Sequence, residues 1–193
     1  MRQISSRGIL LIFLLPILVL LGVILVPAGD GEAYTYGGYY WSGARAEFYN
    51  DIAGWDPNLI TAPGDTWSFA GSPFRFVFKG NNVLYMGDGK NTVSRYYRSF
   101  DDVAKTYIVS RSGSVLTEVD LIINTKYDWG CCGEPDMYDV RNVTTHEFGH
   151  WLVLGDQYND WDFFDTMYYT TYEGETRKRT LAGDDINGIN YIY

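Results

Sequence analysis

The sequence Thr144-Thr145-His146-Glu147-Phe148-Gly149-His150-Trp151-Leu152-Val153-Leu154-Gly155-Asp156 contains the pattern H-E-x-x-H. Residues four positions apart lie on the same face of a helix, so the imidazoles of His146 and His150 can bind one metal ion. Glu147 lies beside them, where its carboxylate can hold a water molecule on that metal. The pattern therefore predicts a zinc site with two protein ligands and a general base, as in zinc peptidases.

The scarcity of histidine strengthens this interpretation. The chain has two histidines among 193 residues, and both lie in the pattern. A pair of surface histidines on an ordinary amphipathic helix is the competing interpretation, and the flanking sequence favours the metal site. We predict a helix over Asp139–Leu154, ended by Gly155. Its buried side is expected to consist of Val140, Val143, Phe148, Trp151, Leu152 and Leu154.

The rest of the chain mixes strand and helix patterns. Apolar and alternating segments predict strands near 46–49, 74–78 and 83–86, and a hairpin of 104–110 and 115–124. Helices are predicted over 57–69, where Pro63-Gly64 would break or kink the chain, and over 182–193. No repeat or linker divides the sequence, so residues 34–193 are expected to form one domain, which we take to be a monomer.

Composition narrows the class of partner. Hydrophobic residues make up 46% and charged residues 20% of the chain, which is typical of a globular protein. The formal net charge of -9 argues against a nucleic-acid partner and against attachment to an anionic membrane surface. The acidity is compatible with bound calcium, and the polar loop 87–91 is a candidate site, although an ordinary turn is the simpler interpretation.

The N-terminal segment, 1–33, predicts export. Arg2 and Arg7 precede the uncharged apolar run 9–26, and small residues follow it. This order is typical of a secretory signal peptide, and cleavage after Ala28 or Ala33 would fit. The run is also close to the length of a membrane-spanning helix, so an uncleaved N-terminal anchor is the alternative. In both cases the protein is expected outside the cell, secreted or held on the outer face of the membrane.

The two cysteines, Cys131 and Cys132, are adjacent. An ordinary intrachain disulfide needs separated partners, so the sequence has no disulfide framework. A vicinal bridge, two free thiols and an intermolecular bridge all remain open.

Four further features of the sequence indicate a protein family. Asp156 stands at the third-ligand position of the extended pattern H-E-x-x-H-x-x-G-x-x-H/D. Thr166-Met167-Tyr168 is a candidate Met-turn, and Val119–Asn124 is a predicted strand that precedes the H-E-x-x-H pattern. Leu181–Ile189 is similar to the C-terminal helix of the family named next. In these features the chain resembles the metzincin zinc peptidases, and within them the matrixin-like (M10-type) group. The resemblance covers roughly Phe48 to Tyr193.

The resemblance implies an α+β domain of the metzincin kind. Its sheet would be twisted, mixed and mostly parallel, with five strands, an antiparallel edge strand, an active-site helix and a C-terminal helix. It implies these site residues: zinc ligands His146, His150 and Asp156, general base Glu147, Met167 beneath the metal and Tyr169 as support for the oxyanion. A protein or peptide substrate would pair as an extended strand along the sheet edge at 104–110.

The chain departs from the family pattern at Val153, where the family has the glycine at which the chain turns away from the helix. A left-handed conformation is costly for valine, so Gly155 is predicted to make the turn instead. If that displaces Asp156, the alternative third ligands are Asp160, Asp162 and Asp165.

A second departure concerns Cys132-Gly133-Glu134-Pro135-Asp136, which matches the letters of a propeptide motif that blocks the zinc in matrixins. Here it lies just before the active-site helix, so we interpret it as a loop, with a cysteine on zinc as a separate hypothesis.

The sequence therefore predicts an exported zinc metalloendopeptidase. One alternative is a catalytically silent, metzincin-like binding or surface protein, although Glu147 would then have no purpose. Another is a metal-binding protein without peptidase activity, although metal binding alone requires neither a Met-turn nor the last helix.

Overall fold

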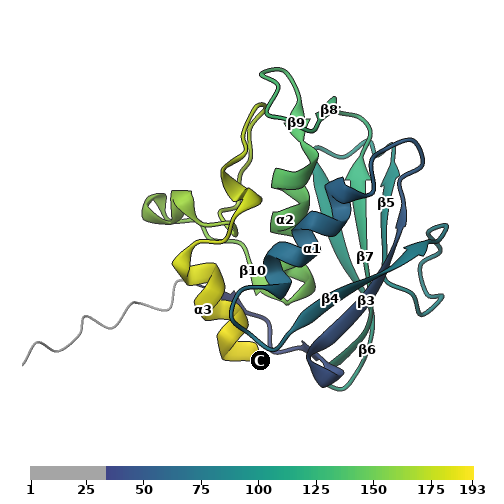
Figure 1. Ribbon diagram of the computed structural model, residues 1–193, viewed down its shortest axis with the longest axis vertical. Coiled ribbons are helices and arrows are strands. Elements are labelled where there is room, and N and C mark those ends of the chain that lie inside the picture. The colour runs from purple at the N-terminus through teal and green to yellow at the C-terminus, as the bar shows by residue number, and fades with distance from the viewer. Residues whose placement is uncertain (1–33) are drawn as a thin grey trace, which may run out of the picture. The chain divides into compact units, whose positions relative to one another are not determined.

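The computed structural model describes residues 34–193 (Figure 1). The predicted signal peptide or anchor, 1–33, lies outside the described residues. No helix within 34–193 combines the length and the apolar character that a membrane span needs.

The main sheet of the described chain has six strands. They are β2 (Tyr40–Trp41), β3 (Arg45–Asp51), β4 (Arg75–Asn81), β5 (Thr92–Tyr96), β6 (Ala104–Ser112) and β7 (Val115–Asn124). Strands β4, β3, β5 and β7 follow one another in parallel, and β6 lies antiparallel to β7. The two-residue β2 pairs in parallel with the first residues of β7. The predicted mostly parallel sheet with an antiparallel edge is confirmed, with β2 as an addition.

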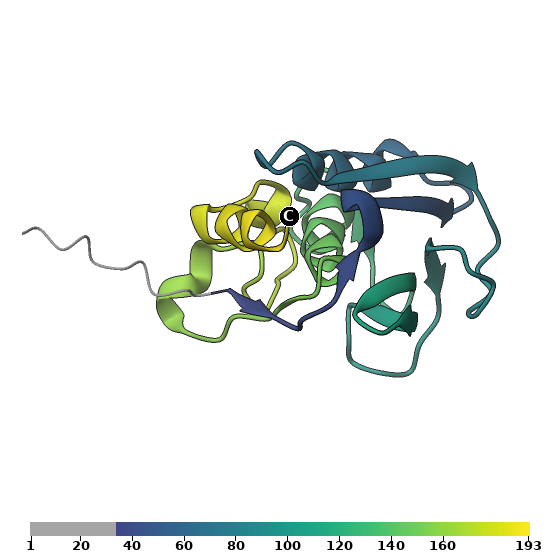
Figure 2. The ribbon, with the colours of Figure 1, turned by 90° about the horizontal axis from the view of Figure 1, so that it is seen from below.

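Two helices, α1 (Asn58–Ser68) and α2 (Val140–Trp151), pack side by side against this sheet (Figure 1). The last helix is α3 (Gly183–Ile192). Short strand pairs join β1 (Thr35–Tyr36) to β10 (Leu154–Gly155) and β8 (Trp129–Gly130) to β9 (Tyr138–Asp139). Three short 3-10 helices complete the described chain: Ser42–Ala44, Asp160–Phe164 and Arg177–Arg179. Figure 2 shows that the first described strand runs beside the segment that follows α2.

Helix α1 continues through Pro63, so of the break or kink expected at Pro63-Gly64 the break is wrong. A proline lacks the N–H that would bond to the carbonyl four residues earlier. The Thr144 hydroxyl of α2 lies 3.5 Å from that carbonyl, on Leu59, and donates its one proton to the nearer Val140 carbonyl, at 2.7 Å. Gly64 allows close packing, because a Cβ there would lie 3.2 Å from Phe76 and 3.4 Å from Phe48 and Phe148.

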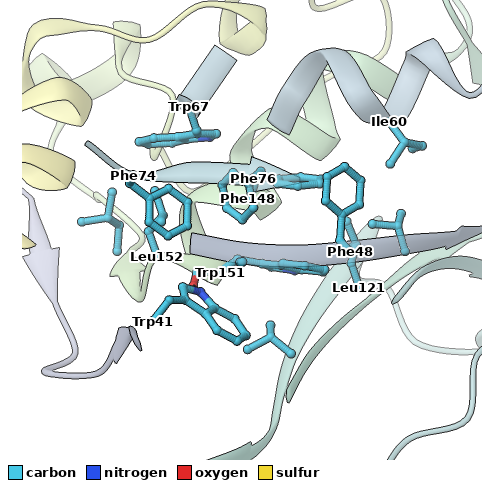
Figure 3. Close-up of a cluster of buried hydrophobic side chains, with 14 of the residues drawn as sticks. Trp41, Phe48, Ile60, Trp67, Phe74, Phe76, Leu121, Phe148, Trp151 and Leu152 are labelled. Carbon is cyan, nitrogen blue, oxygen red and sulfur yellow. The ribbon is translucent and has the colours of Figure 1, made fainter. Parts of the chain in front are cut away.

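The core between the helices and the sheet is aromatic (Figure 3). Phe48 of β3 meets Phe76, Phe148 and Trp151 edge-on, and the rings of Phe148 and Trp151 stack at 5.1 Å. Trp67 of α1 donates its indole N–H to the Thr145 carbonyl, at 2.7 Å. This packing fixes one side of α2, so the opposite side faces the cavity described below.

The structure differs from the sequence prediction at two segments. Residues 83–86 form no strand: the Val83 and Tyr85 side chains are exposed, and the Leu84 N–H bonds to an Asp51 carboxylate oxygen. A strand not predicted from the sequence, β5, follows this segment. Its buried residues include Thr92 and Ser94, so it lacks the apolar alternation by which strands are recognised.

Candidate metal centre

Helix α2 carries the H-E-x-x-H pattern. Asp139 caps its N-terminus, because the Asp139 carboxylate accepts the Asn142 N–H at 2.8 Å, and it also pairs with Arg179. His146 and His150 lie one turn apart, with ring centroids separated by 4.7 Å. The two imidazoles therefore occupy one face of the helix, as the spacing predicts.

Hydrogen bonds fix the tautomers of both histidines. His146 Nδ1 lies 2.7 Å from the Thr166 carbonyl, and His150 Nδ1 lies 2.8 Å from the Leu154 carbonyl. A carbonyl only accepts, so each Nδ1 carries a proton. In the neutral imidazoles each Nε2 then presents a lone pair, which is the arrangement of a metal-binding histidine oriented by its second nitrogen.

Asp156 completes a group of three with the histidines. Its Oδ1 lies 3.2 Å from His146 Nε2 and 3.5 Å from His150 Nε2. Two ligand atoms bound at about 2.0–2.1 Å to one tetrahedral ion lie about 3.3 Å apart. Asp156 Oδ1 is also buried and accepts no hydrogen bond from the described residues. In the neutral imidazoles two lone pairs and a carboxylate oxygen converge on one point, where a bound cation would attract all three, so these residues fit a zinc ion.

Electrostatics around His150 favour a positive charge. Burial lowers its pKa, but the carboxylates of Asp156 and Glu147 outweigh that effect and raise the pKa to about 9. The same carboxylates that would hold a proton here would hold a metal ion. Burial lowers the pKa of His146, which favours its neutral imidazole.

The turn after α2 differs from the sequence-based expectation. Val153 itself adopts the left-handed conformation, with φ 62°, whereas the expected turn at Gly155 does not occur, because Gly155 belongs to strand β10. The strain costs about 1–2 kcal/mol. Gly37 donates its N–H to the Val153 carbonyl at 2.9 Å, and the β1–β10 pairing follows. These contacts bring Asp156 to the histidines although glycine is absent.

Met167 lies under α2. It is 1% exposed, and a Cβ on Gly149 would collide with its sulfur, so Met167 packs against the turn between the two histidines. The Thr166 and Met167 N–H groups donate to the buried Asp185 carboxylate of α3, at 2.9 and 3.2 Å. Asp185 therefore fixes the turn that positions the methionine.

A cavity of about 640 Å³ opens beside these residues. Glu147 lines it, and its Oε2 accepts the Thr106 hydroxyl of β6 at 2.7 Å. Tyr169 lines it too, half exposed, with its ring stacked on Tyr158 at 5.1 Å. Glu147 and Tyr169 thus face the same space as the imidazoles.

The alternative third ligands make no ion pair with either histidine in the described chain. Asp160 is exposed, and Asp162 is buried and accepts the Asn159 amide. Asp165 is partly buried, and burial raises its pKa to about 6. Asp156 is therefore the acid that the fold brings to the histidines.

Cys131 and Cys132 form a vicinal disulfide, which resolves the three alternatives for the pair. Cys132 therefore has no free thiolate to bind a metal, which argues against the hypothesis of a cysteine on zinc. In the candidate calcium loop, the Glu118 carboxylate accepts the N–H groups of Gly87 and Gly89 and closes the turn.

Three residues of the site were missed by reasoning from the sequence. The sequence places Thr106 only within the predicted strand 104–110, and Asp185 only within the predicted helix 182–193. Lys178, which is 2% exposed, lies near His146 and lines the cavity. Nothing in its local sequence distinguishes this lysine from a surface one.

One comparison with known proteins agrees with the motif. A family model described as matrixin matches residues 77–193. A comparison with curated proteins found no match. Among solved structures, the chain is similar to high choriolytic enzyme 1, a hatching-enzyme zinc protease from the medaka fish Oryzias latipes. That similarity has a TM-score of 0.39 and 12% identity, and it covers 78% of this chain and 92% of that one.

Proposed function

Because the chain belongs to the matrixin family of peptidases, we propose that it is an exported zinc endopeptidase. His146, His150 and Asp156 would hold the metal, and Glu147 would be the general base. The observation that carries this proposal is the convergence of two imidazole Nε2 atoms on the buried Asp156 Oδ1. A zinc ion bound there supplies Lewis-acid activation of a water molecule and of the substrate carbonyl.

Glu147 would transfer a proton from the attacking water to the leaving amine. Thr106 holds its Oε2, whereas Oε1 accepts no hydrogen bond from the described residues. Oε1 can therefore take a proton from the attacking water and pass it to the leaving amine. Thr106 belongs to the edge strand β6, so its hydrogen bond holds the Glu147 carboxylate next to that strand.

The substrate would bind as an added strand along β6. This strand pairs with β7 on one side and with no other strand of the described chain. Its first residues, Ala104 to Thr106, line the cavity beside Glu147. An extended peptide paired there would bring a backbone carbonyl toward the site, and Tyr169 would support the oxyanion that forms.

Export rests on the sequence of 1–33. Sequencing the N-terminus of protein recovered from the producing cells tests it. An N-terminus at Gly29 or Tyr34 in the medium supports a cleaved signal peptide, and intact Met1 in the membrane fraction supports an anchor. Intact Met1 in the cytosol would contradict export.

A catalytically silent relative is the competing function, and a matched pair of variants separates the two. The full chain and the variants Glu147→Ala and Glu173→Ala would be assayed for zinc content and casein digestion. Glu173 is an exposed residue outside the cavity lining. We expect zinc in all three proteins, and cleavage by the wild type and Glu173→Ala alone, stopped by a chelator.

Zinc without cleavage in any of the three proteins would favour the silent relative. Equal cleavage by Glu147→Ala would remove Glu147 from the role of general base. Wild-type protein without zinc would overturn the proposal as a whole.

A further inference from the structure

Lys178 is a buried cation beside the metal centre. Its backbone N–H donates to the Asn142 side chain of α2 at 2.7 Å, which fixes the 3-10 helix that carries it. Its Nζ donates to the Tyr168 carbonyl and lies 3.4 Å from His146 Nδ1. The side chain is 2% exposed and contributes to the lining of the cavity that also contains Glu147.

No carboxylate of the described chain lies within ion-pair distance of Lys178. The acids around it have other partners: Glu175 pairs with Arg177 and accepts the Tyr172 N–H, and Glu147 accepts the Thr106 hydroxyl. Since His146 Nδ1 donates to Thr166, it cannot also accept from Lys178. The ammonium group therefore has three N–H donors and one acceptor within residues 34–193.

The other lysines of the described chain have ordinary surroundings. Lys79, Lys105 and Lys126 each pair with a carboxylate, and Lys90 donates to Asn82. Charged side chains are rarely buried without a partner, because the lost hydration is not replaced. Lys178 is the exception among the lysines of this part of the chain, and it contributes to the lining of the cavity where a substrate side chain would bind.

The cavity can accept an acidic group. Thr170 and Thr171 provide hydroxyls in its lining, and the acids Asp101 and Asp102 there are paired with Lys126 and Lys105. A divalent ion would offset the charges of Glu147 and Asp156. A carboxylate entering beside Lys178 would then gain a charge-assisted hydrogen bond.

We propose that Lys178 makes this cavity a subsite for an acidic side chain that flanks the scissile bond of the substrate. The inference rests on the proposed peptidase function and adds a preference to it. Lys178 acts as a specificity residue, which binds the substrate side chain and takes no part in the proton transfer.

The test compares peptides that differ only by Glu or Gln, placed in turn on either side of the scissile bond. For the full-length wild type we expect kcat/KM to be about tenfold higher, or more, with Glu at one of the two positions. This preference should weaken at high salt. Equal rates for the Glu and Gln peptides at both positions would overturn the inference.

Three variants assign the preference to one residue. Lys178→Met should abolish it, and Lys178→Arg should retain part of it. Lys79→Met, which makes the same change of net charge on β4 at the far edge of the sheet, should leave it intact. If Lys178→Met does not fold, the wild-type ratio and Lys178→Arg still decide the question. An unchanged preference in folded Lys178→Met would contradict the inference.

A binding measurement separates this inference from the proposed function. Calorimetry with full-length Glu147→Gln would compare the affinities of the Glu and Gln peptides without cleavage. Tighter binding of the Glu peptide, lost on adding Lys178→Met, supports the subsite even if the wild type cleaves nothing. Equal affinities overturn the subsite, and cleavage by the wild type would then still support the peptidase.

Discussion

Gly37 fits against Val153, because a Cβ on Gly37 would lie 2.5 Å from Val153 Cγ1. The two residues are also joined by the hydrogen bond from the Gly37 N–H to the Val153 carbonyl. Val153 holds a left-handed conformation three residues before Asp156. The start of the described chain therefore clamps the strained turn that brings Asp156 to the histidines.

This clamp predicts coupling between the two positions. Gly37→Ala should destabilise the protein by about 1–3 kcal/mol, because the new methyl group overpacks against Val153. In a Val153→Ala background the same substitution should cost less, because Cγ1 is gone. Urea unfolding of the four proteins measures the free energies, and additive effects would show that Gly37 does not contact Val153 as described.

Asp120 predicts a pH dependence of stability. It is buried on β7, its Oδ1 accepts the Thr92 N–H at 2.8 Å, and its Oδ2 has no partner among the described residues. Burial raises its pKa from 3.8 to about 6. The folded state thus binds a proton that the unfolded state releases, so this contribution is fully present below pH 4 and is lost as the pH rises through about 6.

The variant Asp120→Asn tests that contribution. Its stability should change less than that of the wild type between pH 4 and pH 6, where the contribution amounts to about 3 kcal/mol at most. Urea unfolding across this range gives the two slopes, and Asp136→Asn, at an exposed position, is the matched control. A wild-type stability that rises over this range as steeply as that of Asp120→Asn would contradict the prediction.

Tyr169 predicts a selective loss of rate. If its hydroxyl supports the oxyanion, Tyr169→Phe should lower kcat by about 10²-fold and leave KM and zinc content unchanged. Tyr172→Phe is the control, because Tyr172 is also exposed on the same loop but does not line the cavity. Unchanged kcat in Tyr169→Phe would remove the residue from the mechanism.

The parts of this fold that follow from the sequence are those whose signal is local. Helix α2 is predicted by the spacing of its apolar residues, and the β6–β7 hairpin by the turn between its two strands. Strand β5 was not, because its buried Thr92 and Ser94 bond within the sheet instead of forming an apolar face. Burial of polar residues depends on neighbours that local sequence does not reveal.

The site divides in the same way. The motif identified His146, Glu147 and His150, but the place of Asp156 depended on how Val153 turns. Valine disfavours the left-handed conformation of that turn, and contacts with Gly37, distant in the sequence, stabilise it. Lys178 could not be predicted from the local sequence either. Its burial results from contacts with Asn142 of α2 and with Tyr168, which are distant in the sequence.

The central claim is that Asp156 is the third zinc ligand, and equilibrium zinc binding by full-length protein tests it most directly. The comparison is between wild type, Asp156→Ala and Asp160→Ala, the last removing an exposed acid of the same loop. We predict about one zinc per chain for wild type and Asp160→Ala, and an affinity for zinc at least about 100-fold weaker for Asp156→Ala. Unchanged affinity in Asp156→Ala would contradict the account.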